Sequence, residues 1–540
     1  MKKKCKLLRI IVPVILLLTG FACSEDFLNR PPQDALTLDN FYQTAEQVNA
    51  STASLYGWPW FELNDKAHWV IGDATSGNHW TNDGDMAQFF QLGVTQNNPR
   101  LNEAWNSLFR VIAHSNMVIN NIPTQAGASV PAELKNRVVG EAKFMRATAY
   151  FYLVRLWGAV PIIENNSAIV FDSKIPRNTV ESVYQFIIND LTDAASKLPE
   201  SYSGNDRGRV TKWSAKGMLA KVYLARSGWG QSESRNQADL DMAKELAGDV
   251  INNSGLKLKP EYADLFLYKG EDAEKDNQES LFAFQWIPCQ GWGTQNTNQA
   301  YWAKDNTLTG VGDGWGGYIG PTIDLQNEYE PGDKRRHETI MQDGDYYPEL
   351  KKKDGGYTFV AQPNDGIGEN ACFAAIKKYV IGTPEDNNGK VCFMSTGINT
   401  YVLRLADVYL IYAEAVLGNN PSTSDADALT AFNAVRTRAG LDAKSSITFQ
   451  DIFHERRVEF AYEADFWYDL IRWHYWNPSA AIAFINNQER GTYYWDGTIR
   501  MLSSFKITAT DDSFVLPIPA SETDQNPKLL EPPVPYNFGK

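Results

Sequence analysis

The sequence predicts a mostly α-helical protein in which a loop-rich region with short strands is inserted between two helical blocks. Apolar residues recur at three- and four-residue steps through about 33–255 and again through 401–476, which is the spacing of helices that bury one face. Between these blocks, residues 256–400 are rich in glycine, asparagine, aspartate, tyrosine and tryptophan, a composition typical of loops and turns. Residues 477–540 are expected to form a closing segment.

The first block contains six predicted helices. Asp39 is placed to cap the first of them, which runs through Val48. The others are expected at about 102–121, 131–157, 179–198, 211–226 and 239–252. Ile122-Pro123 and Gly158 are expected to end two of these helices, because a proline disfavours helix at the residue before it and glycine favours a helix end.

The second block opens with a helix whose one face carries Leu405, Val408, Tyr412 and Ala415. Ser424 is placed to cap a partner helix. Helix pairs with short connections, in which large apolar side chains face alanines, resemble degenerate tetratricopeptide repeats. We expect such pairs to form a curved scaffold, because each pair buries its face against the next.

The first 22 residues read as a signal peptide that is removed in the mature protein. Five basic residues precede an apolar stretch from Ile10 to Leu18, which is too short for the roughly 20 residues that span a bilayer. Cys23 follows small residues and resembles the acylated cysteine of a bacterial lipoprotein, although Gly20-Phe21 departs from the usual pattern. The alternative is an ordinary signal peptide with an incidental cysteine.

The acidic pair after Cys23 favours the lipoprotein interpretation. Glu25 and Asp26 resemble the signal by which Bacteroidetes place lipoproteins on the outer face of the outer membrane. Without the signal peptide, the chain carries 46 basic against 65 acidic residues. Such a body repels nucleic acid and anionic headgroups, so we expect lipid at Cys23, rather than a basic surface, to hold the protein at the membrane.

Cysteines and histidines indicate neither a metal site nor a redox centre. Cys289, Cys372 and Cys392 remain in the body, and three cysteines permit at most one internal disulfide. Cys372 and Cys392 flank a predicted hairpin and are the expected pair, although the sequence leaves the other pairings open. The six histidines are scattered, and no CxxC, HExxH, GxxxxGK[ST] or G-x-S-x-G motif occurs. No cofactor and no metal are therefore expected.

Seven sequence blocks occur in an order that matches one known family. They are CSEDFLNRPPQD, EAWNSLFRVIAHSNMVINNIP, GEAKFMRATAYFYLVRLWGAVPII, RVTKWSAKGMLAKVYLARSG, YVLRLADVYLIYAEAV with AFNAVRTRAGL, ERRVEFAYEADFWYDLIRW and FVLPIPASETDQNPKL. From Cys23 to Leu529 the chain resembles the SusD/RagB family of outer-membrane nutrient-binding lipoproteins. The resemblance implies a non-catalytic surface protein that caps a SusC-like TonB-dependent transporter and delivers oligosaccharides, or in some members peptides.

The loops carry the residue types that a sugar site needs. An aromatic ring covers the C–H face of a sugar, while short polar side chains bond its hydroxyl rim. Three clusters combine both types, at 78–83, 286–302 and 313–318. The candidate carbohydrate-binding residues are Trp80, Trp315, Trp292, Trp286, Asn78, Asp83 and Tyr318. For any one of these tryptophans the alternative is packing at the base of its loop or contact with the transporter. Tryptophans of the helical blocks, such as Trp105 and Trp467, are expected in the core.

A catalytic alternative lies in the block ERRVEFAYEADFWYDLIRW. Glu455, Glu459 and Glu463 recur at four-residue steps, and a glycosidase needs two carboxylates about 5–10 Å apart. Three nearby arginines are expected to neutralise these acids, namely Arg456, Arg457 and Arg472. A carboxylate held at low pKa is a poor general acid, so a structural ion-pair network is the preferred interpretation.

Overall fold

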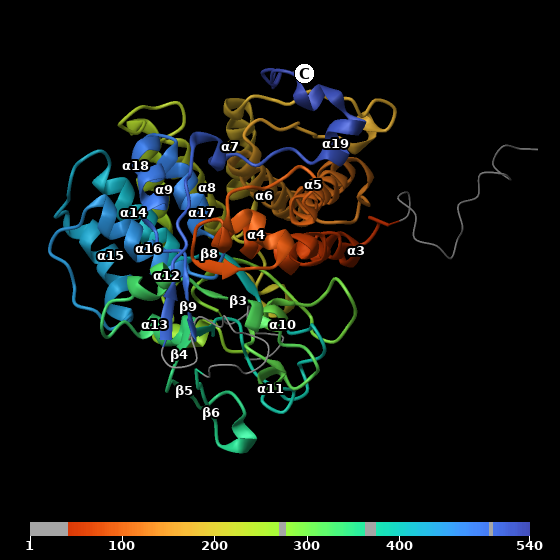
Figure 1. Ribbon diagram of the computed structural model, residues 1–540. Helices are drawn as coiled ribbons and strands as arrows, with labels where there is room; N and C mark the ends of the chain where they lie inside the picture. Colours follow the sequence, from red (N-terminus) through yellow and green to blue (C-terminus); the bar gives the residue numbers. More distant parts are fainter. Residues whose placement is uncertain (1–40, 269–276, 362–373, 496–499, 540) are drawn as a thin grey trace, which may run out of the picture.

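The computed structural model describes residues 41–268, 277–361, 374–495 and 500–539 (Figure 1). Helices form most of the ordered structure, which confirms the predicted fold class. The longer helices are α5 (Pro99–Gln125), α6 (Ala132–Trp157), α7 (Val180–Lys197), α8 (Lys212–Arg226), α9 (Gln237–Asn253), α14 (Leu405–Leu417), α15 (Ala426–Arg438), α16 (Phe449–Phe460), α17 (Phe466–His474) and α18 (Pro478–Asn487). Shorter ones are α3 (Ala45–Ala50), α4 (Gly84–Phe90), α10 (Asn298–Trp302), α11 (Asn306–Thr309), α12 (Ile323–Glu328), α13 (Lys334–Thr339) and α19 (Ala520–Gln525).

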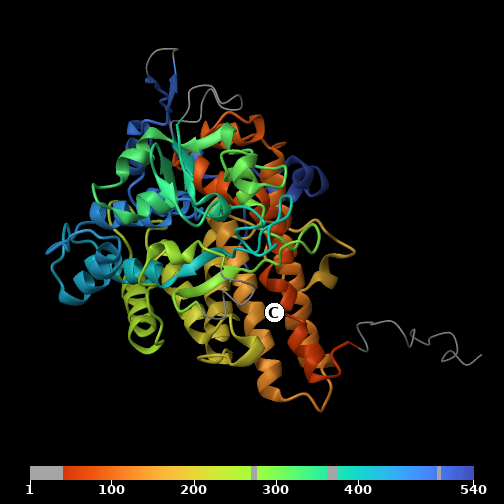
Figure 2. The ribbon, with the colours of Figure 1, turned by 90° about the horizontal axis from the view of Figure 1, so that it is seen from below.

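The long helices lie beside one another in chain order. Helix α5 contacts α6, α6 contacts α7, and the series continues through α8, α9, α14 and α15, as the row of helices in Figure 2 shows. Helix α6 has neighbours on both sides, so nearly every residue from Val138 to Trp157 is buried. This is the stacking of tetratricopeptide-like pairs, in which each helix pair buries its apolar face against the next.

Helix ends follow the sequence closely, with three differences. Asp39 lies outside the described residues, and α3 begins after Thr44, whose side chain accepts from Gln47 N. Helix α5 continues past Pro123 to Gln125, because the Ala126 N–H still bonds the Ile122 carbonyl and closes the last turn. The N-cap of α15 is Asp425 rather than Ser424, since the Asp425 carboxylate accepts from two N–H groups of the first turn.

The described strands are short and form five antiparallel pairs. They are β1 (His79–Thr81) with β3 (Ile319–Pro321), β2 (Ser280–Phe284) with β8 (Thr400–Arg404), β4 (Ile340–Gln342) with β7 (Ala374–Ile376), β5 (Tyr346–Tyr347) with β6 (Tyr357–Thr358), and β9 (Thr492–Trp495) with β10 (Arg500–Ser503). Pairs β1–β3 and β2–β8 join segments far apart in sequence. They set where the loops of residues 256–400 meet the helical blocks.

The core is aromatic as well as aliphatic. Trp105, Trp157, Trp213, Trp467 and Trp473 are all buried, which confirms their predicted core role. In the part of the chain that the structure describes, no helix combines the length and apolarity needed to cross a bilayer.

Candidate carbohydrate-binding site

Strand β1 presents Trp80 toward the outside of the fold. Successive side chains of a strand point to opposite faces, and here His79 and Thr81 are buried while Trp80 is half-buried. Trp80 pairs with Gly320 and Thr81 with Ile319 of β3. This pairing brings the first predicted cluster beside the third.

Trp315 and Tyr318 lie just before β3 in the sequence. Tyr318 is 51% exposed, whereas Trp315 is half-buried. The Trp315 ring contacts Tyr301, with centroids 5.6 Å apart, and Phe393 at 5.9 Å. Phe393 is itself 56% exposed, so aromatic surface continues from the 313–318 loop onto the segment around residue 393.

A disulfide joins Cys289 to Cys392, across a sequence separation of 103. The expected pairing of Cys372 with Cys392 is therefore wrong; Cys372 lies outside the described residues. The physical reason is the β2–β8 pair, in which Phe284 lies opposite Thr400. The chain leaving β2 and the chain entering β8 continue side by side, and Asn296 bridges Thr396. Cys289 thus faces Cys392, although no local pattern links them.

Removing this disulfide is expected to lower the stability of the fold without displacing the loops that it joins. Replacing both cysteines, Cys289→Ser with Cys392→Ser, is expected to cost about 2–4 kcal/mol of unfolding free energy, because the bond closes a long loop in the unfolded chain. The Cys289 N–H to Ser395 Oγ bond of 2.8 Å remains, so the loops stay near their positions. Urea unfolding of the wild type and of the double serine variant, each with and without reductant, measures the effect. Equal stability of the two proteins without reductant would contradict the prediction.

Trp292 is the most exposed of the predicted tryptophans, at 63%. Its ring lies edge-on to Phe61, with centroids 5.1 Å apart. The neighbouring Gly293 lies against Trp58, whose Cδ1 atom is 3.2 Å from the position of a Cβ atom built on that glycine. Any larger residue at Gly293 would meet the Trp58 ring. Trp58 is also exposed and was not expected from sequence, because its segment reads as part of a helical block.

We refer to the exposed and half-buried rings of these loops together as the aromatic surface. Its members are Trp58, Trp80, Trp292, Tyr301, Trp315, Tyr318 and Phe393. Tyr301 was missed although it lies within the cluster 286–302, and Phe393 was missed because only the disulfide reveals which loop it joins. Polar groups border the surface: the Lys66 Nζ atom lies 4.7 Å from the centroid of the Tyr301 ring, and Asp83 is exposed at the start of α4.

Two predicted residues lie inside the fold instead. The Asn78 side chain is fully buried and bonds both Asp73 and Arg457, the latter from Nε at 2.9 Å. Trp286 is also buried, and its indole N–H donates to Thr400 Oγ1 at 3.1 Å. Both side chains stabilise the loops from beneath, and we remove them from the candidate contact residues.

His79 points to the buried face of β1, against Trp69 and Tyr462, and is expected to make stability depend on pH. Among the described residues, neither of its ring nitrogens has a hydrogen-bond partner, and burial lowers its pKa from 6.5 to about 3. Below pH 6.5 His79 is therefore protonated in the unfolded chain but stays neutral in the folded chain. The free energy of unfolding is highest above pH 6.5 and falls as the pH is lowered toward 3, by about 2–3 kcal/mol between pH 6.5 and 4.5. Urea unfolding should show a shallower pH dependence for His79→Phe over this range.

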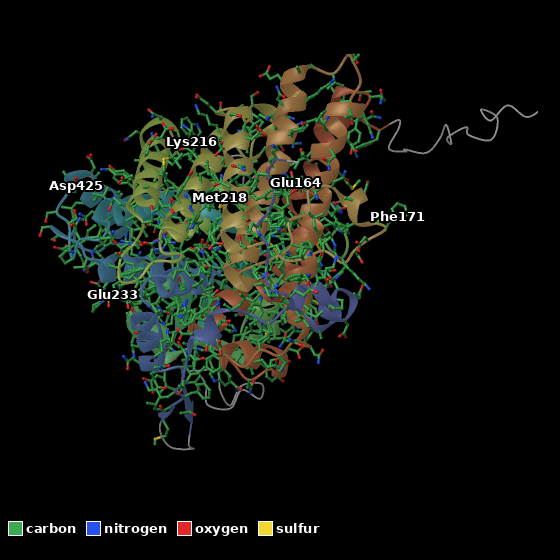
Figure 3. The ribbon with its side chains drawn as sticks, turned by 90° about the horizontal axis from the view of Figure 1, so that it is seen from above. Glu164, Phe171, Lys216, Met218, Glu233 and Asp425 are labelled. Atoms are coloured by element: carbon green, nitrogen blue, oxygen red, sulfur yellow. A yellow bond between two sulfur atoms is a disulfide. The ribbon has the colours of Figure 1, made fainter. Side chains whose placement is uncertain are left out.

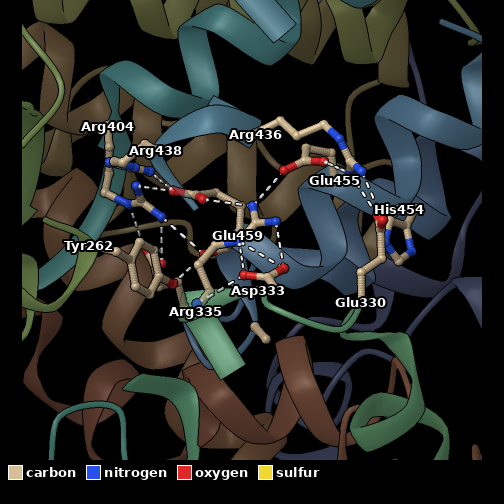
Figure 4. A network of polar contacts seen from close by, with 12 residues as sticks. Tyr262, Glu330, Asp333, Arg335, Arg404, Arg436, Arg438, His454, Glu455 and Glu459 are labelled. Carbon is tan, nitrogen blue, oxygen red and sulfur yellow. Dashed lines mark hydrogen bonds and ion pairs between the residues drawn. The ribbon is translucent and has the colours of Figure 1, made fainter. Parts of the chain in front are cut away.

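The carboxylates of the catalytic alternative belong to a buried ion-pair network (Figure 4). Glu455 and Glu459 both accept from Arg335 Nη1, at 2.6 and 3.1 Å. Arg404 reaches Glu459 at 2.8 Å and Glu463 at 2.8 Å. All three acids are buried, so none faces a substrate. Burial alone would raise the pKa of Glu459, but Arg438, Arg404 and Arg335 together hold it far below its ordinary value.

The network is as predicted, but its cations were assigned wrongly. Arg456 bonds Asp407, Asp465 and Asp469, because adjacent residues of α16 point to different sides of the helix. Arg457 bonds Glu328 and Asp324, and Arg472 bonds Glu414 and Asp469. Glu463 is also not on the helical face of Glu455 and Glu459, since α16 ends at Phe460. Across the described ranges, no group of three metal-ligating side chains is positioned to hold an ion.

Residues 262–534 match the profile of the SusD family, and residues 26–224 match a second profile described as starch-binding, associating with outer membrane. A SusD-like protein of Bacteroides ovatus is 41% identical, and the similarity covers 99% of both chains. The chain belongs to the SusD family. Members of this family are non-catalytic, carbohydrate-binding proteins associated with the outer membrane.

A solved structure and a further sequence relative agree with this assignment. One, whose description names a xylogluco-oligosaccharide, is 40% identical with a TM-score of 0.83, and the match covers 91% of this chain and 100% of that one. The starch-binding protein SusD of Bacteroides thetaiotaomicron is 22% identical, over 84% of this chain and 82% of its own. The mostly helical fold with paired helices is thus the SusD fold.

Proposed function

We propose that this protein binds glucan chains of the xyloglucan class at the cell surface and passes them to a SusC-like TonB-dependent transporter. The observation that carries the proposal is the aromatic surface, whose exposed and half-buried rings come from four separate segments. The β1–β3 pair and the Cys289–Cys392 bond hold three of these segments in place. Several rings suit an extended glucan, because each sugar offers a C–H face for stacking. The xylogluco-oligosaccharide of the 40%-identical structure supports the choice of glycan.

Within the proposed site, Trp80, Trp315 and Trp292 carry the sugar rings, and Tyr318 extends the surface outward. Asp83 and Lys66 supply polar groups at its border for sugar hydroxyls. Stacking contributes about 1–2 kcal/mol per aromatic ring, so several rings together give micromolar to millimolar affinity. Weak binding of this kind suits a protein that must release its ligand to a transporter.

Lipid on Cys23 would hold the protein at the outer face of the outer membrane. Cys23 lies outside the described residues, as does the rest of the segment before residue 41. The sequence pattern around it and the outer-membrane association of the family support this location.

Affinity electrophoresis tests the proposed ligand. Native gels containing xyloglucan, laminarin or no polysaccharide are run with the wild-type protein, and a protein of similar size that binds no glycan serves as the mobility control. We expect retardation in xyloglucan and little or none in laminarin. Unretarded migration in xyloglucan would contradict the glycan assignment, and binding of peptides in a parallel titration would favour peptide cargo instead.

The catalytic alternative receives no support from the described geometry. Glu455, Glu459 and Glu463 are buried and paired with arginine or lysine, so none of them lies at a surface where a sugar could bind. Incubation with xyloglucan is expected to leave chain length unchanged.

A further inference from the structure

A loop between α6 and α7 exposes two large apolar side chains at its tip. Phe171 is 97% exposed and Val170 is 70% exposed, and Figure 3 shows Phe171 protruding at the edge of the molecule. Isolated exposed apolar residues are common in soluble proteins, so exposure alone does not indicate a binding surface. Three features around the tip indicate a function for it: the anchoring of the loop, the lack of charge on the neighbouring part of α5, and the position of the N-terminal segment.

The loop is held firmly at both of its ends. Asn120 and Asn116 of α5 donate to the carbonyl groups of Glu164 and Ile163, at 2.9 and 2.8 Å. At the other end, Asn526 Nδ2 donates to the Ile175 carbonyl at 2.8 Å. The tip is therefore presented in a defined direction by the helical body.

The second half of helix α5, which lies beside the loop, lacks charge. From Val111 to Ala132 the sequence contains no lysine, arginine, aspartate or glutamate, although 21% of all residues are charged. Met117, Asn120 and Thr124 recur at three- and four-residue steps on α5 and are exposed. An exposed helix face of this kind avoids the desolvation cost that charges would incur against an apolar phase.

The first described residues lie against the same end of α5. Gln43 Nε2 donates to the Gln125 carbonyl at 3.1 Å, and the Gly127 N–H donates to the Tyr42 carbonyl at 3.0 Å. Gln125 and Asn120, which holds the loop, lie about 8 Å apart along the helix. The 17 residues from Ser24 to Asn40 can span at most about 60 Å. A lipid on Cys23 would therefore keep this end of α5 within about 60 Å of the membrane, and other parts of the molecule could lie farther away.

We propose that the face formed by Met117, Asn120, Thr124, residues 126–129 and the Val170–Phe171 tip rests on the lipid surface, with Val170 and Phe171 inserted at the interface. The inference rests on the proposed lipid anchor, which supplies the high local concentration that two apolar side chains need. The absence of charge on the α5 part of this face favours a lipid surface, because no charge there has to be desolvated. Asp172 and Lys174, exposed beside the tip, have opposite charges and add no net charge to the face. Contact at a second point restrains how the tethered body tilts over the membrane.

A fluorescent label on the tip tests the contact. The chain from Ser24 carries an N-terminal histidine tag and is bound to phosphatidylcholine vesicles containing nickel-chelating lipid. The environment-sensitive dye NBD is attached to Phe171→Cys in a Cys372→Ser background. We expect a blue shift and about a twofold or greater gain in emission on vesicle attachment, as the dye leaves water. The same dye on Ser424→Cys should not change, because Ser424 adjoins Asp425 at the opposite edge in Figure 3.

A charged tip provides the matched variant. With the dye on Ala168→Cys, adding Val170→Asp and Phe171→Asp is expected to abolish the emission gain, because carboxylates resist burial in lipid. These side chains are exposed, so circular dichroism and glycan retention should not change. Equal emission from the labels at 171 and 424 on vesicles would overturn the proposal and assign the face to a protein partner. The chelating lipid replaces the native anchor, so this result does not depend on acylation. Fatty-acid labelling of wild type against Cys23→Ala tests the anchor separately.

Discussion

Arg404→Met is expected to destabilise the protein by about 3–5 kcal/mol, because it removes one partner of a buried charge network. Arg404 ends strand β8 and bonds three carboxylates, from Nε and Nη2 to Glu463 and from Nη1 to Glu279 and Glu459, all at 2.8 Å. Methionine preserves much of the side-chain volume but leaves buried negative charge uncompensated. Urea unfolding followed by circular dichroism measures the loss.

Two further variants separate the charge effect from general damage. Lys334→Met removes an exposed cation 3.8 Å from Glu261 and should cost under about 1 kcal/mol. Adding Glu279→Gln to Arg404→Met should restore part of the lost stability, because it removes one of the buried negative charges that Arg404 neutralises. A loss after Arg404→Met no larger than after Lys334→Met would show that the network contributes little.

The network also explains how the fold is assembled. Its members come from β8, the segment before β2, α13, α15 and α16, which are far apart in the sequence. Arg438 joins Glu279 to Glu459, and Lys378 bonds Glu463 at 2.8 Å. One buried cluster therefore ties the loop-rich region to the second helical block. The loops that carry the aromatic surface depend on this attachment.

Replacing Trp80 and Trp315 together by alanine is expected to abolish glycan retention. Loss of about 1–2 kcal/mol of stacking at each ring weakens binding by roughly 30- to 1,000-fold. A protein that starts with micromolar to millimolar affinity would then bind too weakly to be retarded in an affinity gel. Both tryptophans are half-buried, so the thermal midpoint of the variant must be measured beside its retention.

Two single variants complete this test. Tyr318→Ala truncates an exposed ring of the aromatic surface and should weaken binding about fivefold without affecting stability. Phe171→Ala removes an exposed ring elsewhere on the molecule and should leave retention unchanged in purified protein. Full retention by the Trp80/Trp315 variant would show that the glycan binds at another place.

Predictions from local pattern were the most successful. Helices α6 to α9 begin and end within about two residues of the predicted positions, because their caps and their 3.6-residue periodicity depend only on residues that are close together in the sequence. The end of α5 and the N-cap of α15 differ by a few residues, where one hydrogen bond decides between neighbouring alternatives.

Within the predicted clusters, composition alone could not tell exposed rings from buried ones. Trp286 and Trp292 belong to the same cluster, yet one is buried against Thr400 and the other is exposed. Asn78 and Trp80 are two residues apart, but Asn78 precedes β1 and turns inward to Arg457. The β1–β3 and β2–β8 registers decide these outcomes, and register depends on segments more than 100 residues away.

The helical class, the order of the helices and the resemblance to the SusD family could all be read from the sequence, because they follow from local periodicity and from motifs that occur in order. Three features required the three-dimensional packing: the bond between Cys289 and Cys392, the pairing of Arg335, Arg404 and Arg438 with the acids of α16, and the choice of aromatic rings that face outward. Arg335 and Glu455 are 120 residues apart in the sequence, and the two bonded cysteines are 103 apart. Such pairings arise from packing the two helical blocks against the loops, which no local pattern records.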